Sequence, residues 1–145
     1  MNSSDPFELN RFLEAQDGIF DTALDELRAG SKRSHWMWFI FPQFAGLGPS
    51  ATAQLYGIAS MKEAQAYLAH TILGRRLTQC VEALLPWAGK MAAHEILGAV
   101  DALKLRSSLT LFDRVAPGGL FAQALDSFYG GVADERTLAL LDASR

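Results

Sequence analysis

Residues 31–43 form the most unevenly polarised stretch of the chain. Two cations, a hydroxyl and an imidazole are followed there by a run of large apolar side chains that a proline closes. Lys32 and Arg33 cannot enter a core without a severe desolvation cost, whereas the aromatic block at 36–41 cannot remain in water. The junction between the two halves is therefore predicted to lie at a boundary of the core, which is a natural place for a ligand site.

The apolar run at 36–41 is hydrophobic on every face, so its periodicity does not separate a buried strand from a buried helix. Its aromatic content favours a strand. No second segment of the sequence reads convincingly as a strand, however, so a strand here would have no partner. Ser34 can cap a short helix that Pro42 helps to end. We therefore predict a short buried helix that begins at Ser34, with a strand as the alternative.

Helical periodicity and capping signals recur along the rest of the chain. Asp5-Pro6 is typical of a helix start, and Ser60 with Glu63 forms a capping box. Residues 72–85 read as a longer amphipathic helix, and residues 100–112 as a further one. These signals predict an all-α fold.

The length of the chain fits one domain. A chain of 145 residues buries about 68–70% of its unfolded surface, which is enough for a hydrophobic core. Neither a repeat nor a long linker divides the sequence, so residues 1–145 are predicted to form a single compact all-α domain of about eight mostly short helices. Short helices are marginal in isolation, so they must stabilise one another by packing.

Composition and charge exclude several classes of protein. Hydrophobic residues make up 50% of the chain, which excludes a mainly disordered protein. The formal net charge of −3 argues against a nucleic-acid-binding protein, which usually carries a broad basic stripe. No window approaches the roughly 18 continuous apolar residues of a membrane span, and the polar N-terminus is unlike a signal peptide. We expect a soluble cytoplasmic protein that binds neither nucleic acid nor membrane.

The cysteine and histidine content predicts neither a disulfide nor a metal site. Cys80 is the only cysteine, and its apolar neighbours at helical spacing predict a reduced thiol in the core. His35, His70 and His94 lie far apart in the sequence, and no pair of cysteine or histidine residues has a recognised metal-ligand spacing. We therefore expect no metal and no cofactor.

Several motifs together resemble a known family. They are Asp5-Pro6-Phe7, the Phe-Leu-Glu-Ala-Gln stretch at 12–16, the Lys-Arg-Ser-His-Trp motif at 32–36 with its continuation to Gln43, Gly46-Leu47-Gly48, and the stretch from Lys104 to Phe112. This combination resembles the bacterial domain-of-unknown-function family 1810 (DUF1810), some members of which carry a misleading calpastatin label. The resemblance spans nearly the whole chain. It implies a compact multihelical fold with no established activity.

The Lys-Arg-Ser-His-Trp motif predicts a pocket for a small anion. Lys32 and Arg33 supply positive charge, Ser34 and His35 supply directional hydrogen bonds, and Trp36 supplies a stacking face. A helix that opens at Ser34 would add the positive end of its dipole. We therefore predict binding of a small anionic ligand that resembles a nucleotide or a sugar phosphate.

A second segment is predicted to complete this pocket. On a helix over 100–112, Lys104, Ser107 and Ser108 lie on one side because they follow i, i+3, i+4 spacing. Serines within a helix also bond back to the preceding turn, which is the structural alternative. The predicted ligand-binding set is Lys32, Arg33, Ser34, His35, Trp36, Gln43, Lys104, Ser107 and Ser108, with no metal ligand among them.

Two alternative functions stay open at this point. The first is a hydrolase that acts on such a ligand, with His35 as the catalytic acid or base. Glu14, Asp17 or Asp113 could serve as a general base if the fold brings one of them to His35. Motifs of the familiar enzyme classes are absent from the sequence, so whether the protein is an enzyme is left open. The second alternative is a protein–protein interaction module that presents the loop at 44–49 to another protein.

Overall fold

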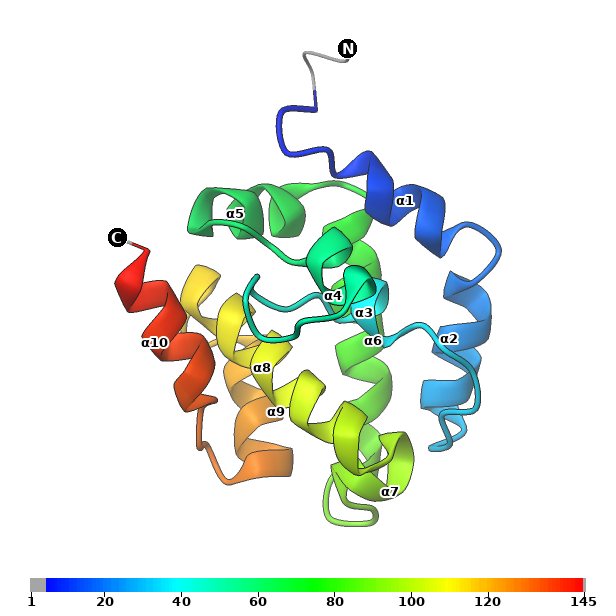
Figure 1. Cartoon of the computed structure of the whole chain (residues 1–145). Helices are drawn as coiled ribbons and strands as arrows, with labels where there is room; N and C mark the ends of the chain where they lie inside the picture. The colour runs from blue at the N-terminus through cyan, green and yellow to red at the C-terminus, as the bar shows by residue number, and fades with distance from the viewer. Residues whose placement is uncertain (1–4, 145) are drawn as a thin grey trace.

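The computed structural model describes residues 5–144. Within this range the chain folds into ten α-helices and one 3-10 turn, without a named strand (Figure 1). The elements are α1 (Asn10–Gln16), α2 (Phe20–Arg28), α3 (Met37–Ile40), α4 (Ala51–Tyr56), α5 (Met61–Ala69), α6 (Leu73–Leu84), η1 (Leu85–Trp87), α7 (Ala93–Leu97), α8 (Ala99–Val115), α9 (Leu120–Tyr129) and α10 (Glu135–Ala143). The predicted all-α fold is confirmed, with two more helices than the eight or so expected from the sequence.

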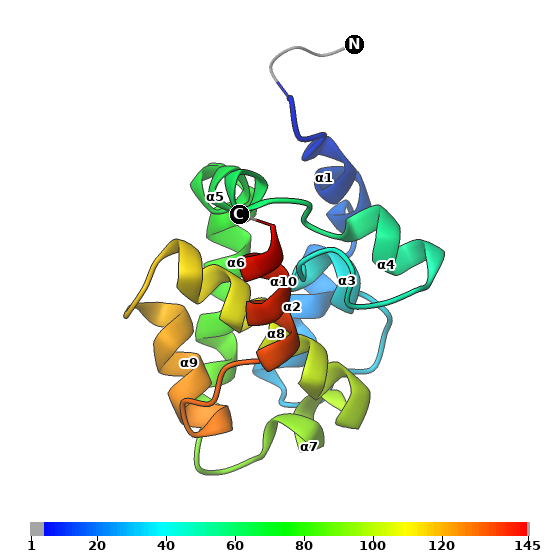
Figure 2. The same ribbon diagram turned by 60° about the vertical axis from the view of Figure 1, so that its left-hand side comes forward.

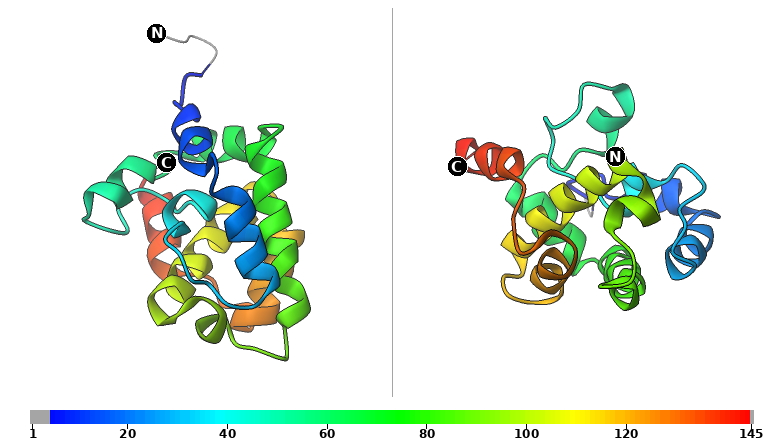
Figure 3. Two further views of the ribbon diagram at one scale, coloured as in Figure 1. Left: turned by 90° about the vertical axis from the view of Figure 1, so that its right-hand side faces the viewer. Right: turned by 90° about the horizontal axis from the view of Figure 1, so that it is seen from below.

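The helices pack in pairs around the short helix α3. Figures 1 and 3 show α2 beside α6, and Figures 1 and 2 show α8 beside α9. Helix α8 also packs against α5, α7 and α10, while α3 contacts α1, α4 and α6. The segment that follows the charged motif thus enters the middle of the molecule. Among the described residues, none of the helices combines the length and the apolar character that crossing a membrane requires.

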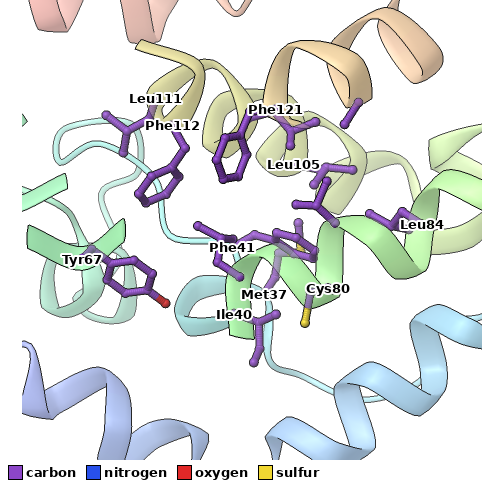
Figure 4. Close-up of a cluster of buried hydrophobic side chains, with 14 of the residues drawn as sticks. Met37, Ile40, Phe41, Tyr67, Cys80, Leu84, Leu105, Leu111, Phe112 and Phe121 are labelled. Atoms are coloured by element: carbon purple, nitrogen blue, oxygen red, sulfur yellow. The ribbon is translucent and has the colours of Figure 1, made fainter. Parts of the chain in front are cut away.

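The segment at 36–41 carries four of its six side chains into the core, while Trp38 and Phe39 are half-buried. Trp36, Met37, Ile40 and Phe41 are all buried. In Figure 4, Met37, Ile40 and Phe41 lie among side chains of other helices, including the buried thiol of Cys80. Burial raises the pKa of that thiol to about 12, although Arg28 and Arg76 oppose the shift. The cysteine is therefore a core residue, as the sequence predicts.

The predicted start of this helix is wrong. The helix begins at Met37, and its N-cap is Trp36, which makes no side-chain capping bond. Ser34 does not cap the helix because its hydroxyl donates instead to a carboxylate of α2. The strand alternative has a small counterpart just after the helix, where Phe44 and Ile58 form a single parallel bridge.

A buried polar network links α3 to the neighbouring helices. The Gln16 side-chain amide donates to the carbonyl of Phe39 at 2.7 Å and to the hydroxyl of Tyr67 at 3.2 Å. The guanidinium of Arg76 in turn donates to Gln16 Oε1 at 3.1 Å. Each buried polar atom named here has a partner, so the network ties α1, α3, α5 and α6 together without leaving an uncompensated buried group.

Candidate functional site

Four hydrogen-bond donors of the Lys-Arg-Ser-His-Trp motif converge on the carboxylate of Glu26. The backbone N–H groups of Arg33 and Ser34 donate to Glu26 Oε1 at 2.8 and 3.1 Å, and the indole Nε1 of Trp36 donates to the same oxygen at 2.9 Å. The Ser34 hydroxyl donates to Oε2 at 2.6 Å. The motif therefore does surround an anion, but that anion is a side chain of the protein itself.

The turn after α2 brings this carboxylate to the motif. Gly30 ends the helix with φ of +67°, a conformation that side-chain-bearing residues rarely adopt. A Cβ atom at Gly30 would also lie 3.0 Å from the indole of Trp87. The amide of Ser31 donates to the carbonyl of Glu26 at 3.0 Å and closes the turn. The chain then runs back along α2, so that residues 33–36 pass the carboxylate of Glu26.

These four hydrogen bonds change the acidity of Glu26. Burial alone would raise the pKa of the carboxyl. The bonds from Ser34, Arg33 and Trp36 favour the charged form more strongly, and they lower the pKa from 4.5 to about 2. Glu26 is therefore a carboxylate at neutral pH and holds the loop in its charged state. Sequence reasoning missed this residue because nothing nearby in the sequence distinguishes it from the other acidic residues of α2.

Lys32 lies beside this cluster and faces α8. Its ammonium donates to the carbonyl of Ser34 at 2.7 Å and pairs with Asp101 Oδ2 at 2.9 Å. The same Nζ lies 4.9 Å from the centroid of the Trp36 ring. The side chain of Lys32 is 8% exposed, so its charge is largely withdrawn from water and depends on Asp101.

A second lysine joins the same carboxylate. Lys104 Nζ lies 3.3 Å from Asp101 Oδ1, and it stands over the ring of Trp38 at 4.1 Å from the centroid. We call Lys32, Asp101 and Lys104 the Lys–Asp–Lys cluster. It carries two positive charges and one negative charge. Through this cluster α8 reaches the motif, so the structure brings the predicted residues Lys32 and Lys104 together.

The two serines of α8 differ in their contacts. Ser107 is buried, and its hydroxyl donates to the carbonyl of Leu103 one turn earlier at 3.2 Å, which is the back-bonding alternative considered from the sequence. Ser108 is 1% exposed, and its hydroxyl has no hydrogen-bond partner among residues 5–144. Ser108 lies one helical turn after Lys104, on the same side of α8.

Gln43 is a second buried polar residue without a side-chain partner. Its backbone carbonyl accepts from the amide of Ile58 at 2.9 Å, but its side-chain Nε2 is paired with none of the described residues. The side chain lines a cavity of about 10 Å³ together with Trp38, Gly48 and Tyr56, among others. That volume is close to the minimum for one water-sized group. Gln43 is thus a donor that can serve one acceptor atom.

Arg33 and His35 are exposed, and neither side chain makes a hydrogen bond or ion pair within the described part of the chain. Two of the carboxylates suggested as a partner for His35 bind elsewhere. Glu14 accepts from the side chain of Asn10, and Asp113 accepts from the amide of Gly118.

The loop proposed as a protein-binding surface is partly internal. Phe44 is 5% exposed, and Gly46 approaches the side chain of Leu140 in α10. Phe44 therefore adds no surface for a partner. Among the residues that the structure describes, no group of three or more histidine, cysteine or acidic side chains is placed to hold a metal ion.

A family model described as a protein of unknown function (DUF1810) matches residues 6–141. The chain belongs to this DUF1810 family. The resemblance drawn from the motifs is thereby confirmed. The crystal structure at 1.38 Å of the conserved hypothetical protein Rv1873 from Mycobacterium tuberculosis is similar, with 49% sequence identity and a TM-score of 0.91. The match covers 95% of this chain and 99% of that one. Comparison with curated proteins gives no match.

The role of Glu26 predicts a pH-dependent loss of stability on substitution. Because folding lowers the pKa of Glu26, its ionised form stabilises the native state above pH 4.5, and this contribution disappears as the pH falls towards 2. Glu26→Gln should lower the free energy of unfolding by about 2 kcal/mol at neutral pH, because it loses charge-assisted hydrogen bonds. The difference from the wild type should shrink below pH 4.5. Urea denaturation over a pH series measures both effects.

Asp25→Asn provides a matched control, since Asp25 is an exposed carboxylate of the same helix. It should change the free energy of unfolding by less than about 0.5 kcal/mol. A constant difference between Glu26→Gln and wild type from pH 7 to pH 2 would contradict the role given to Glu26.

Proposed function

We propose that this DUF1810 protein binds a small anionic ligand of the sugar-phosphate type at the Lys–Asp–Lys cluster, beside the Lys-Arg-Ser-His-Trp motif. The observation that carries the proposal is that two ammonium groups, Lys32 and Lys104, share the single carboxylate of Asp101. Within this cluster, Asp101 balances one of the two positive charges. A phosphate or carboxylate that approaches Lys104 would neutralise the other.

The position of Lys104 favours contact with a ligand. Its side chain is 23% exposed, against 8% for Lys32, so Lys104 is the member of the cluster that an incoming anion can reach. The ammonium of Lys32 already binds the Ser34 carbonyl and Asp101, so in this proposal Lys32 positions Asp101. Arg33, in the same loop as Lys32, is exposed and adds a second accessible cation to this part of the chain.

Gln43 supports a ligand with an uncharged oxygen as well as an anionic group. Trp38 lies under the ammonium of Lys104 and also lines the small cavity that Gln43 lines. We take the buried and unpaired Gln43 amide as the donor to one oxygen atom of the ligand. Sugar phosphates carry both kinds of oxygen. In this proposal Ser34 and Trp36 act indirectly, since Glu26 already accepts their hydrogen bonds.

Binding is proposed here in preference to hydrolysis. A general base needs to lie within hydrogen-bond reach of the group that it deprotonates. Glu14 and Asp113, which the sequence suggested as general bases near His35, accept hydrogen bonds from Asn10 and Gly118 instead. The catalytic role of His35 therefore stays a prediction.

Titration calorimetry with ribose 5-phosphate, glucose 6-phosphate, adenosine monophosphate and inorganic phosphate tests the proposal. At least one of these phosphates should bind. Lys104→Ala should weaken that binding at least tenfold, or about 1.4 kcal/mol, since it removes the accessible ammonium. Free ribose should not bind measurably.

Lys90→Ala is the matched control, because Lys90 is an exposed lysine outside the cluster. Its affinity for the same phosphate should equal that of the wild type. If none of the four phosphates binds, or if Lys104→Ala and Lys90→Ala have equal affinity, the proposal is wrong.

Gln43→Leu should separate stability from binding. Leucine has a similar volume and removes a buried donor that has no partner among residues 5–144, so the free energy of unfolding should stay unchanged or rise by about 1 kcal/mol. Binding of the phosphate found above should weaken, because the ligand loses a hydrogen bond. Chemical denaturation and the same calorimetric titration measure the two effects. A destabilised variant with unchanged affinity would show that Gln43 has a structural role only.

A further inference from the structure

A separate cavity of about 430 Å³ opens between the start of α5, the end of α8 and the last turns of α10. Figure 2 shows α10 ending close to α5. The lining residues are Ala59, Ser60, Met61, Lys62, Arg114, Leu141, Asp142 and Ser144. This volume is typical of a small-molecule site, which usually measures about 300–1,000 Å³. None of the residues of the Lys–Asp–Lys cluster contributes to it.

The wall of this cavity is largely apolar. Leu141 is buried, and Met61 packs against the hydrophobic core while it also lines the cavity. Ala59 adds an exposed methyl group. A hydrocarbon group that enters the cavity would lie against this apolar wall and be removed from water. The hydrophobic effect therefore favours a ligand with a hydrocarbon part.

Two cationic side chains line the cavity. Lys62 of α5 and Arg114 at the end of α8 are both exposed, and neither side chain has a hydrogen bond or an ion pair with another described residue. Asp142 contributes one negative charge, so these three side chains sum to one positive charge. A guanidinium and an ammonium that line one cavity are suited to a carboxylate or phosphate oxygen.

We propose that this cavity binds an organic anion with an apolar body, whose carboxylate or phosphate head pairs with Arg114 and Lys62 while its hydrocarbon part lies against Met61 and Leu141. The site is independent of the sugar-phosphate site. It needs different residues and a different ligand chemistry, so either site can fail without the other.

Nuclear magnetic resonance titration of ¹⁵N-labelled full-length protein tests this site with four probes. Octanoate and octyl phosphate carry both a charged head and a chain, octanol carries the chain alone, and acetate carries the charge alone. One or both octyl anions should shift the amide signals of residues around the cavity saturably. They should bind at least tenfold more tightly than octanol or acetate. Whichever of octanoate and octyl phosphate has the higher affinity identifies the preferred head group.

Three variants locate the binding. Arg114→Ala should weaken binding of the tighter octyl anion at least fivefold, whereas Arg75→Ala, an exposed arginine on α6, should leave it unchanged. Ala59→Phe should block the cavity and abolish binding, and it substitutes an exposed side chain, so the fold should survive.

Equal binding of octanoate, octyl phosphate and octanol would reduce the effect to hydrophobic adsorption and overturn the proposal. The same holds if Arg114→Ala and Arg75→Ala bind alike, if Ala59→Phe keeps wild-type affinity, or if none of the probes binds.

Discussion

The carboxylate of Glu26 fixes the loop on which the rest of the site depends. It accepts hydrogen bonds from two backbone amides, a hydroxyl and an indole of residues 33–36. With these donors satisfied, Trp36 can be buried with its indole N–H paired, and Met37 and Ile40 of α3 lie in the core beside Phe41. The same arrangement directs Lys32 towards α8, where Asp101 neutralises it. A single acidic side chain of α2 thus holds the loop that carries Lys32 and leads into α3.

An internal anion changes how the Lys-Arg-Ser-His-Trp motif is understood. Backbone amides and a serine hydroxyl beside two cations are the elements of a phosphate site, and here Glu26 already accepts the hydrogen bonds of those donors. In the proposal, an external anion binds next to the motif, at Lys104, which shares Asp101 with Lys32 and lies over the Trp38 ring. The proposed site therefore keeps Lys32, Gln43 and Lys104 from the predicted set, with Ser34 and Trp36 as supports.

The sequence predicted those features that depend on local pattern. Helical periodicity gave the all-α fold, and the apolar neighbours of Cys80 placed it correctly in the core. Ser34 has the residue type of an N-cap, yet its hydroxyl donates to Glu26, eight residues earlier in the chain. Likewise Asp101, which joins Lys32 to Lys104, lies far from the motif in sequence. These partners are determined by how α2 and α8 pack against the loop. Periodicity and capping rules describe only local sequence and do not predict such packing.

The most direct measurement follows the indole N–H signal of Trp36 and the amide signals of Arg33 and Ser34 by nuclear magnetic resonance during an acid titration. If Glu26 accepts all three hydrogen bonds, the three signals should move together with one midpoint near pH 2, while the other amide signals keep the dispersion of a folded protein. Separate midpoints for the three signals, or a shared midpoint near pH 4.5 in the folded protein, would contradict this account.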